Sequence, residues 1–138
     1  MHSRFHTLIA LALLAGAAAA CDDSTTTTTP TTPAQTVTET FSSTLTINGA
    51  VTHQFATTSR GTITATLKTL EPDATAIIGV SLGTWNGTSC AIILANDQAA
   101  VGTGLLGTVS GVGNLCLRVY DVGKLKGPAT YSVDVTHP

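Results

Sequence analysis

The sequence has few aromatic and few charged residues, which make up 4% and 10% of its 138 positions. The segment after residue 20 carries five Lys and Arg against eight Asp and Glu, a formal net charge of −3. These cations are scattered, so no basic stripe is present to neutralise phosphates, and we expect no nucleic-acid partner. The longest apolar stretch, Leu8–Ala20, is shorter than the about 20 residues of a transmembrane helix.

Motifs that carry catalytic chemistry are also missing. There is no G-x-S-x-G nucleophile elbow and no glycine loop followed by Lys-Ser/Thr, and after residue 20 there is no C-x-x-C or H-x-x-x-H spacing. His53 and His137 each stand alone, which favours a sheet face or a chain end over a metal or general-base role. The aspartates form no D-x-D-x-D pattern for calcium. We therefore predict a protein that is not an enzyme and needs no cofactor or metal.

The N-terminal segment has the three parts of a secretory signal. Arg4 supplies a positive charge, Leu8–Ala15 is an uncharged apolar run, and Gly16–Ala20 consists of small residues. A short buried helix would show the same run, but no partner helix is evident in the sequence. We expect residues 1–20 to be a signal peptide.

Cys21 follows Ala18-Ala19-Ala20 directly. This stretch resembles the lipobox of bacterial lipoproteins, although that family usually has Leu at the position of Ala18. The resemblance implies that Cys21 becomes the lipidated first residue of an exported, membrane-anchored protein. The same alanines also fit ordinary A-x-A cleavage, which would leave a free thiol.

Cys90 and Cys116 remain as an even pair when Cys21 is lipidated. Disulfides persist in exported proteins, so we predict a structural bridge between the two. A zinc site or a reactive thiol is the alternative, but further zinc ligands are lacking. Cys116 shares strand parity with Arg118 and Tyr120, which predicts a bridge on the outer face or at a strand end.

Residues 21–39 contain Cys21 and a stretch dominated by threonine and proline. This composition is typical of a solvated, semi-rigid spacer. We expect it to link the anchor to a domain at residues 40–138.

The segment from 40 to 138 alternates apolar and polar residues between turn signals, which predicts about eight short strands. Asn48-Gly49 is a hairpin signal and Asn86-Gly87 marks a second turn, and the apolar run Cys90–Leu94 indicates a central strand covered on both faces. The expected fold is an all-β antiparallel sandwich or jelly roll.

This segment is also similar to the bacterial pre-peptidase C-terminal domain, a β-sandwich appended to secreted enzymes. The similarity lies in the strand around Phe55, in Gly61–Leu67, in Gly113–Asp121 and in Tyr131–Val135. It implies a β-sandwich, and no catalytic domain accompanies it in this sequence. Fold alone implies no function.

Trp85 is the only tryptophan and lies at a predicted loop edge. Exposed there, it could stack on a sugar or anchor a protein partner; buried, it would close one end of the sandwich. The leading hypothesis is a non-enzymatic lipoprotein whose sandwich is an interaction or structural module of the cell envelope, with the membrane and an envelope protein or glycan as partners. The alternative is an exported protein that binds a small ligand or glycan.

Overall fold

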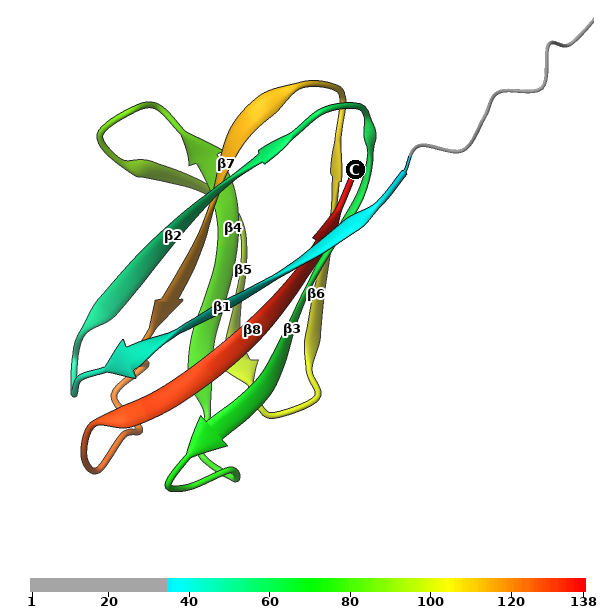
Figure 1. The fold of residues 1–138 in the computed structure, drawn as a ribbon. Coiled ribbons are helices and arrows are strands. Elements are labelled where there is room, and N and C mark those ends of the chain that lie inside the picture. Colours follow the sequence, from blue (N-terminus) through cyan, green and yellow to red (C-terminus); the bar gives the residue numbers. More distant parts are fainter. Residues whose placement is uncertain (1–34) are drawn as a thin grey trace, which may run out of the picture. The chain divides into compact units, whose positions relative to one another are not determined.

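The computed structural model describes residues 35–138, which form eight strands in two sheets (Figure 1). Cys21, the expected signal peptide and most of the expected spacer lie outside the described residues. The predicted all-β sandwich is confirmed. The strands are β1 (Val37–Leu45), β2 (Ala50–Thr57), β3 (Gly61–Glu71), β4 (Ile78–Trp85), β5 (Cys90–Ala99), β6 (Gly104–Val109), β7 (Gly113–Tyr120) and β8 (Ala129–His137).

The topology is that of a jelly roll. Sheet A has the order β1-β8-β3-β6 and sheet B the order β2-β7-β4-β5, with every pairing antiparallel. Consecutive strands lie in different sheets, except for β4 and β5, which pair with each other. Each sheet therefore contains strands from both halves of the domain, as two interleaved Greek keys require.

The two Asn-Gly signals have different outcomes. At Asn86-Gly87, where the sequence predicts a turn, the chain joins β4 to β5 in a hairpin. At Asn48-Gly49 the turn forms, with φ of 53° at Asn48 and a 2.9 Å hydrogen bond from the Gly49 N–H to the Thr46 carbonyl. The hairpin predicted there is wrong, because β1 pairs with β8 and β2 with β7. The turn chemistry reverses the chain but does not decide which strands pair.

The core lies between the sheets and follows the alternation in the sequence. In β8, for example, Tyr131, Val133 and Val135 are buried while the residues between them are partly exposed. Fully burying such side chains contributes about 1.5–3 kcal/mol each. Strands β3 and β7 contribute further apolar side chains to this core: Ile63, Ala65, Leu67, Leu70, Leu115, Leu117 and Val119.

The prediction of a central strand at Cys90–Leu94 is wrong, because β5 is the edge strand of sheet B. Ile92 and Ile93 are 42% and 75% exposed. The strand buried on both faces is β4. Its outer face carries Gly79 and Gly83, and the Tyr120 ring and the Ala91 backbone lie where their side chains would be. Strand β5 also continues through Ala99.

The predicted disulfide between Cys90 and Cys116 is present, with a Cα–Cα distance of 5.8 Å. Cys116 points away from the core residues of β7, so the bridge lies on the outer face of sheet B, at the start of β5. This is the location that its strand parity indicates. No helix among residues 35–138 is long and apolar enough to span a membrane.

Candidate binding pocket between β5 and β6

The sandwich has a pocket on the side where β5 and β6, the edge strands of sheets B and A, run without pairing to each other. Its volume is about 220 Å³. It reaches from this edge into the space between the sheets. The residues that line it are Phe55, Ile63, Leu82, Gly83, Ile93, Leu94, Gly107, Thr108, Val109 and Leu115.

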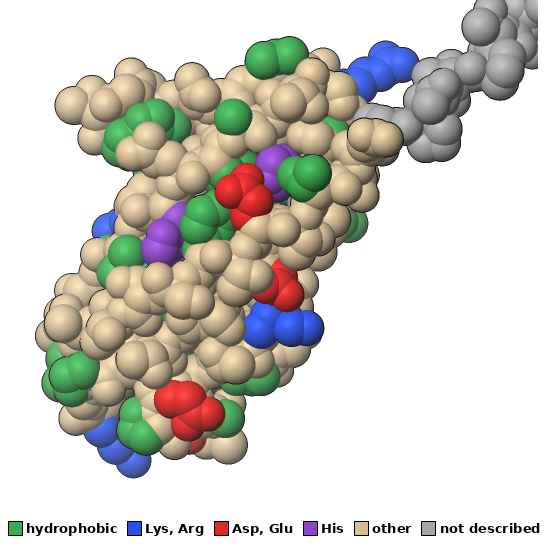
Figure 2. All heavy atoms as spheres, viewed as in Figure 1, with side chains coloured by type: hydrophobic (Ala, Val, Ile, Leu, Met, Phe, Trp, Pro, Cys, Tyr) green, Lys and Arg blue, Asp and Glu red, His purple; other side chains and the backbone are tan. Residues whose placement is uncertain are grey.

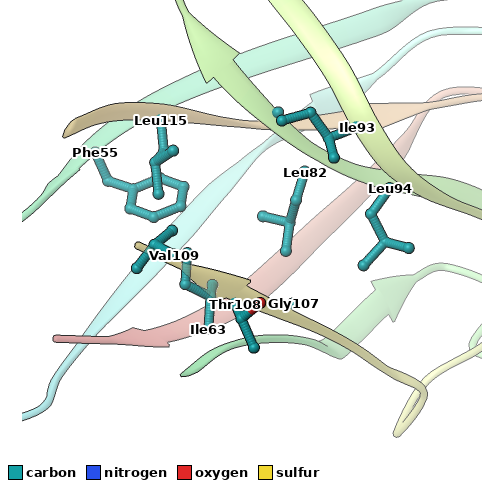
Figure 3. Close-up of a pocket in the computed structure, with 10 residues that line it drawn as sticks. Phe55, Ile63, Leu82, Ile93, Leu94, Gly107, Thr108, Val109 and Leu115 are labelled. Atoms are coloured by element: carbon teal, nitrogen blue, oxygen red, sulfur yellow. The ribbon is translucent and has the colours of Figure 1, made fainter. Parts of the chain in front are cut away.

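All four strands of sheet B contribute to one wall. Phe55 and Leu115 lie at one end of the pocket and Ile93 and Leu94 at the other, with Leu82 between them (Figure 3). The spatial order of these residues along the pocket follows the strand order β2-β7-β4-β5, so the pocket runs across the strands. The opposite wall comes from the two strands β3 and β6 of sheet A.

Gly107 keeps the pocket open at its outer end. It has the strand parity of the inward-facing Leu105, and a Cβ there would lie 3.8 Å from Leu94 Cδ2 and 3.9 Å from Leu82 Cδ1. These are ordinary van der Waals distances, so a larger side chain at residue 107 would extend into the pocket without a clash at its Cβ. A glycine at an inward position of an edge strand thus leaves space that a side chain would otherwise fill.

Ile93 lies at the mouth of the pocket because β5 is irregular there. The register of β5 against β4 shifts between Leu82 and Gly83, and Ile93 has no partner residue in β4. Such a bulge re-aims side chains at a sheet edge. Ile93 is left mostly in solvent while still lining the pocket.

The pocket is apolar and uncharged. Thr108 is the only lining residue with a side-chain hydroxyl, and none is ionisable. Among the described side chains, no buried nitrogen or oxygen lacks a hydrogen-bond partner. Within residues 35–138, no group of three or more His, Cys, Asp or Glu is placed to hold a metal ion. The pocket can therefore bind an apolar group by burial, but it offers no residue for acid–base or nucleophilic chemistry.

His53 lies on the other open side of the sandwich, between β1 and β2. Its Nε2 is 2.7 Å from the hydroxyl of Tyr131. Burial lowers the pKa of His53, and it raises the pKa of Tyr131 to about 12. At neutral pH the phenol therefore keeps its proton and can donate a hydrogen bond to the uncharged imidazole.

His137 belongs to the same side of the molecule. The residue is 2% exposed, and its Nε2 lies 2.8 Å from Oε1 of Glu39. The ring centroid of Phe55 is 5.0 Å from that of His137, and the centroid of Phe41 is 5.1 Å from that of His53. Figure 2 shows the two histidines on one face with hydrophobic and acidic side chains between them. These contacts link β1, β2 and β8, so both histidines have structural partners.

Trp85 is half-buried at the end of β4, where it pairs with Cys90. It is neither in the core nor among the residues packed against the core, so the interpretation as a core tryptophan is wrong. It does not line the β5–β6 pocket. Its role in binding stays a prediction, and so does the lipidation of Cys21, which lies outside the described residues.

Sequence reasoning missed the pocket. Its walls come from six strands, and no local pattern reports how they meet. The one available signal is the segment Gly104-Leu105-Leu106-Gly107, in which the second glycine takes the parity of the buried leucine.

Comparison with known proteins adds a fold relationship. No family model and no curated protein matches the chain. Among solved structures, the Yersinia pseudotuberculosis-derived mitogen is similar, with 18% sequence identity and a TM-score of 0.54. The match covers 74% of this chain and 86% of the mitogen chain. At this identity the likeness shows the β-fold alone. The similarity to the pre-peptidase C-terminal domain stays a prediction.

Proposed function

We propose that this chain is an exported binding module without catalytic activity, anchored by a lipid on Cys21, which binds an apolar group of its ligand between β5 and β6. The observation that carries the proposal is the open, uncharged pocket of about 220 Å³ at that edge. Binding sites are commonly concave and mostly apolar, and this pocket has that character, with a volume below the about 300–1,000 Å³ of sites for drug-sized ligands. The ligand or envelope partner would bury an apolar part there and leave the remainder outside.

Export and anchoring are supported by separate features. The Cys90–Cys116 disulfide is typical of proteins that fold in an oxidising compartment. The signal-like segment and the alanines before Cys21 point the same way. The intact mass of the native protein from the membrane fraction tests this part. A mass that starts at Cys21 and includes acyl chains supports anchoring, and an unmodified mass from the soluble fraction contradicts it.

Binding is tested with small apolar probes on the Cys21→Ser variant, which lacks the thiol that a lipid would modify. Methyl NMR spectra are recorded with toluene and with 1-hexanol. We expect shifts at Ile63, Leu82 and Leu94, whose methyl groups lie along the pocket. If neither probe moves these signals, the pocket is not a binding site and the proposal fails.

A matched pair of variants assigns the site. Gly107→Leu adds a side chain toward Leu82 and Leu94 and is expected to abolish the shifts. Gly104→Leu adds the same side chain on the same strand, but at an exposed position next to Thr66, and is expected to leave the shifts unchanged. Equal loss in both variants would show that the probes bind elsewhere or that β6 is perturbed as a whole.

A glycan site at Trp85 is the second candidate function. It is favoured by the position of this half-buried indole outside the core, next to the exposed turn at Asn86. Trp85→Ala should then remove binding on a glycan array while the NMR response of the pocket persists. An array that shows no glycan bound by the wild-type protein would eliminate this candidate.

A further inference from the structure

The pocket is elongated, and its length limits what can enter. Its wall on sheet B includes residues from all four strands, which are spaced about 4.8 Å apart, so it extends over about 14 Å. Its lining is apolar along this length, so an extended hydrocarbon chain can make contact with the walls from one end of the pocket to the other.

From this shape we propose that the pocket takes a single unbranched aliphatic chain, which enters beside Ile93 and Leu94 and ends against Phe55 and Leu115. The inference rests on the proposed function, because it names the class of ligand that the same site binds. An apolar cavity of about 150 Å³ in another protein holds benzene, with six carbons. By proportion, about 220 Å³ holds about nine carbons.

The small number of carbons that the pocket can hold also indicates whether the ligand comes from a membrane or from water. A membrane lipid that moved one acyl chain into the pocket would bury only part of that chain and expose the rest to water. It would lose contacts that the bilayer provides along the whole chain. A molecule in the aqueous phase with a short alkyl tail has no contacts with a bilayer to lose. The ligand is therefore a water-soluble compound with such a tail, and neither a bilayer lipid nor the chain's own lipid.

The polar end of the ligand has little influence on binding. No lining residue is charged, and Ile93 at the mouth is an apolar side chain. Affinity should therefore come from burying methylene groups, and it should change little with the charge of the head group.

The test is a chain-length series on the Cys21→Ser variant. Straight-chain alkanoates, alkyl trimethylammonium salts and alkyl glucosides with six to twelve carbons are titrated below their micelle concentrations, by calorimetry and by methyl NMR. Each added methylene should raise affinity about fourfold, which corresponds to about 0.8 kcal/mol. The increase should stop near nine carbons and should be the same for the three head groups. Gly107→Leu should shorten the optimal tail or abolish binding, and Gly104→Leu should do neither.

The other outcomes overturn the inference in distinguishable ways. If toluene shifts the pocket methyl groups and no alkyl compound does, the proposed binding function stands and the aliphatic class is wrong. If no probe binds and Gly107→Leu only raises the melting temperature, the pocket is a packing gap and both proposals fail. An affinity that rises without a plateau would show unspecific partitioning. If the native lipidated protein without ligand already has the alkyl-bound spectrum, its own acyl chain is the occupant.

Discussion

Gly83 of β4 and Ala91 of β5 are in such close contact that a Cβ on Gly83 would lie 2.2 Å from the Ala91 carbonyl oxygen. This contact brings the start of β5 over the outer face of β4. Cys116, in β7, is the cross-strand neighbour of Gly83, and β7 lies on the opposite side of β4 from β5. The missing side chain at residue 83 therefore lets the disulfide join two strands that are not neighbours in the sheet.

Gly83→Ala should destabilise the domain by about 1–3 kcal/mol, because the added methyl group meets backbone that has no free space to move into. It should also slow formation of the disulfide, since Cys90 would be pushed away from Cys116. Urea unfolding and thiol quantification after export measure the two effects. Gly111→Ala is the control, because a Cβ there meets nothing within 4 Å, and its unfolding free energy should stay within about 0.5 kcal/mol of wild type.

Removing the disulfide should cost about 3.5 kcal/mol, the entropy expected for a cross-link between cysteines 26 positions apart. Urea unfolding of the Cys90→Ser/Cys116→Ser double variant, with and without reductant, measures this loss. Reductant should reduce the unfolding free energy of the wild-type protein by a similar amount and leave the double variant unchanged. A double variant as stable as wild type would show that the bridge does not stabilise the fold.

The sequence predicts side-chain direction in this domain better than strand pairing. Alternation places Val133, Val135 and Leu117 in the core correctly, because the period of two depends only on the strand itself. The pairing of Phe41 with Val133 joins the two ends of the domain, and nothing near either residue indicates it. The hairpin predicted at Asn48-Gly49 was wrong for the same reason: the turn is local, but the strands on either side of it belong to different sheets.

The same limit applies to the candidate site. The pair Cys90 and Cys116 could be predicted because only two cysteines remain when Cys21 is assigned to the lipid. The burial of β4 could not, because its outer face is covered by Tyr120 and Ala91 from other strands. The run at Cys90–Leu94 is apolar although Ile93 is exposed, and the proposed binding function would account for this apolar side chain in solvent, because Ile93 lines the pocket.

Asp121 holds two connections together at one end of the sandwich. Its Oδ1 accepts hydrogen bonds from the backbone N–H groups of Gly123, Lys124 and Leu125 at 2.9–3.2 Å, and its Oδ2 accepts one from Asn48 at 2.9 Å. Desolvation raises the pKa of Asp121, but these four donors together outweigh it and lower the pKa.

Asp121→Ala should therefore lower the unfolding free energy by about 1–3 kcal/mol, because it removes four hydrogen bonds to a charged acceptor. Asp121→Asn keeps one acceptor oxygen and should lose less. Thermal unfolding at pH 7 compares the two variants. A loss of the same size in both would show that the carboxylate charge, and not the number of acceptor atoms, stabilises this end of the domain.

His53 gives the domain a pH dependence of known sign. Burial lowers its pKa in the folded state, so below about pH 6.5 the unfolded chain binds a proton that the folded domain does not. The stabilisation that comes from keeping His53 neutral is therefore complete above that pH and declines as the pH falls toward the folded-state pKa. Asp121 acts in a separate, more acidic range, because its lowered pKa removes stability only as the pH falls below about 4.

Urea midpoints between pH 8 and pH 5 should decrease for the wild-type protein and stay nearly constant for His53→Gln, whose amide does not titrate. Tyr131→Phe is the matched control for the hydrogen bond, since it removes the hydroxyl 2.7 Å from His53 Nε2 and keeps the ring. If burial is the cause, Tyr131→Phe retains the pH dependence and lowers the midpoint at every pH. A flat profile in wild type, or an equal slope in His53→Gln, would place the titrating group elsewhere on the domain.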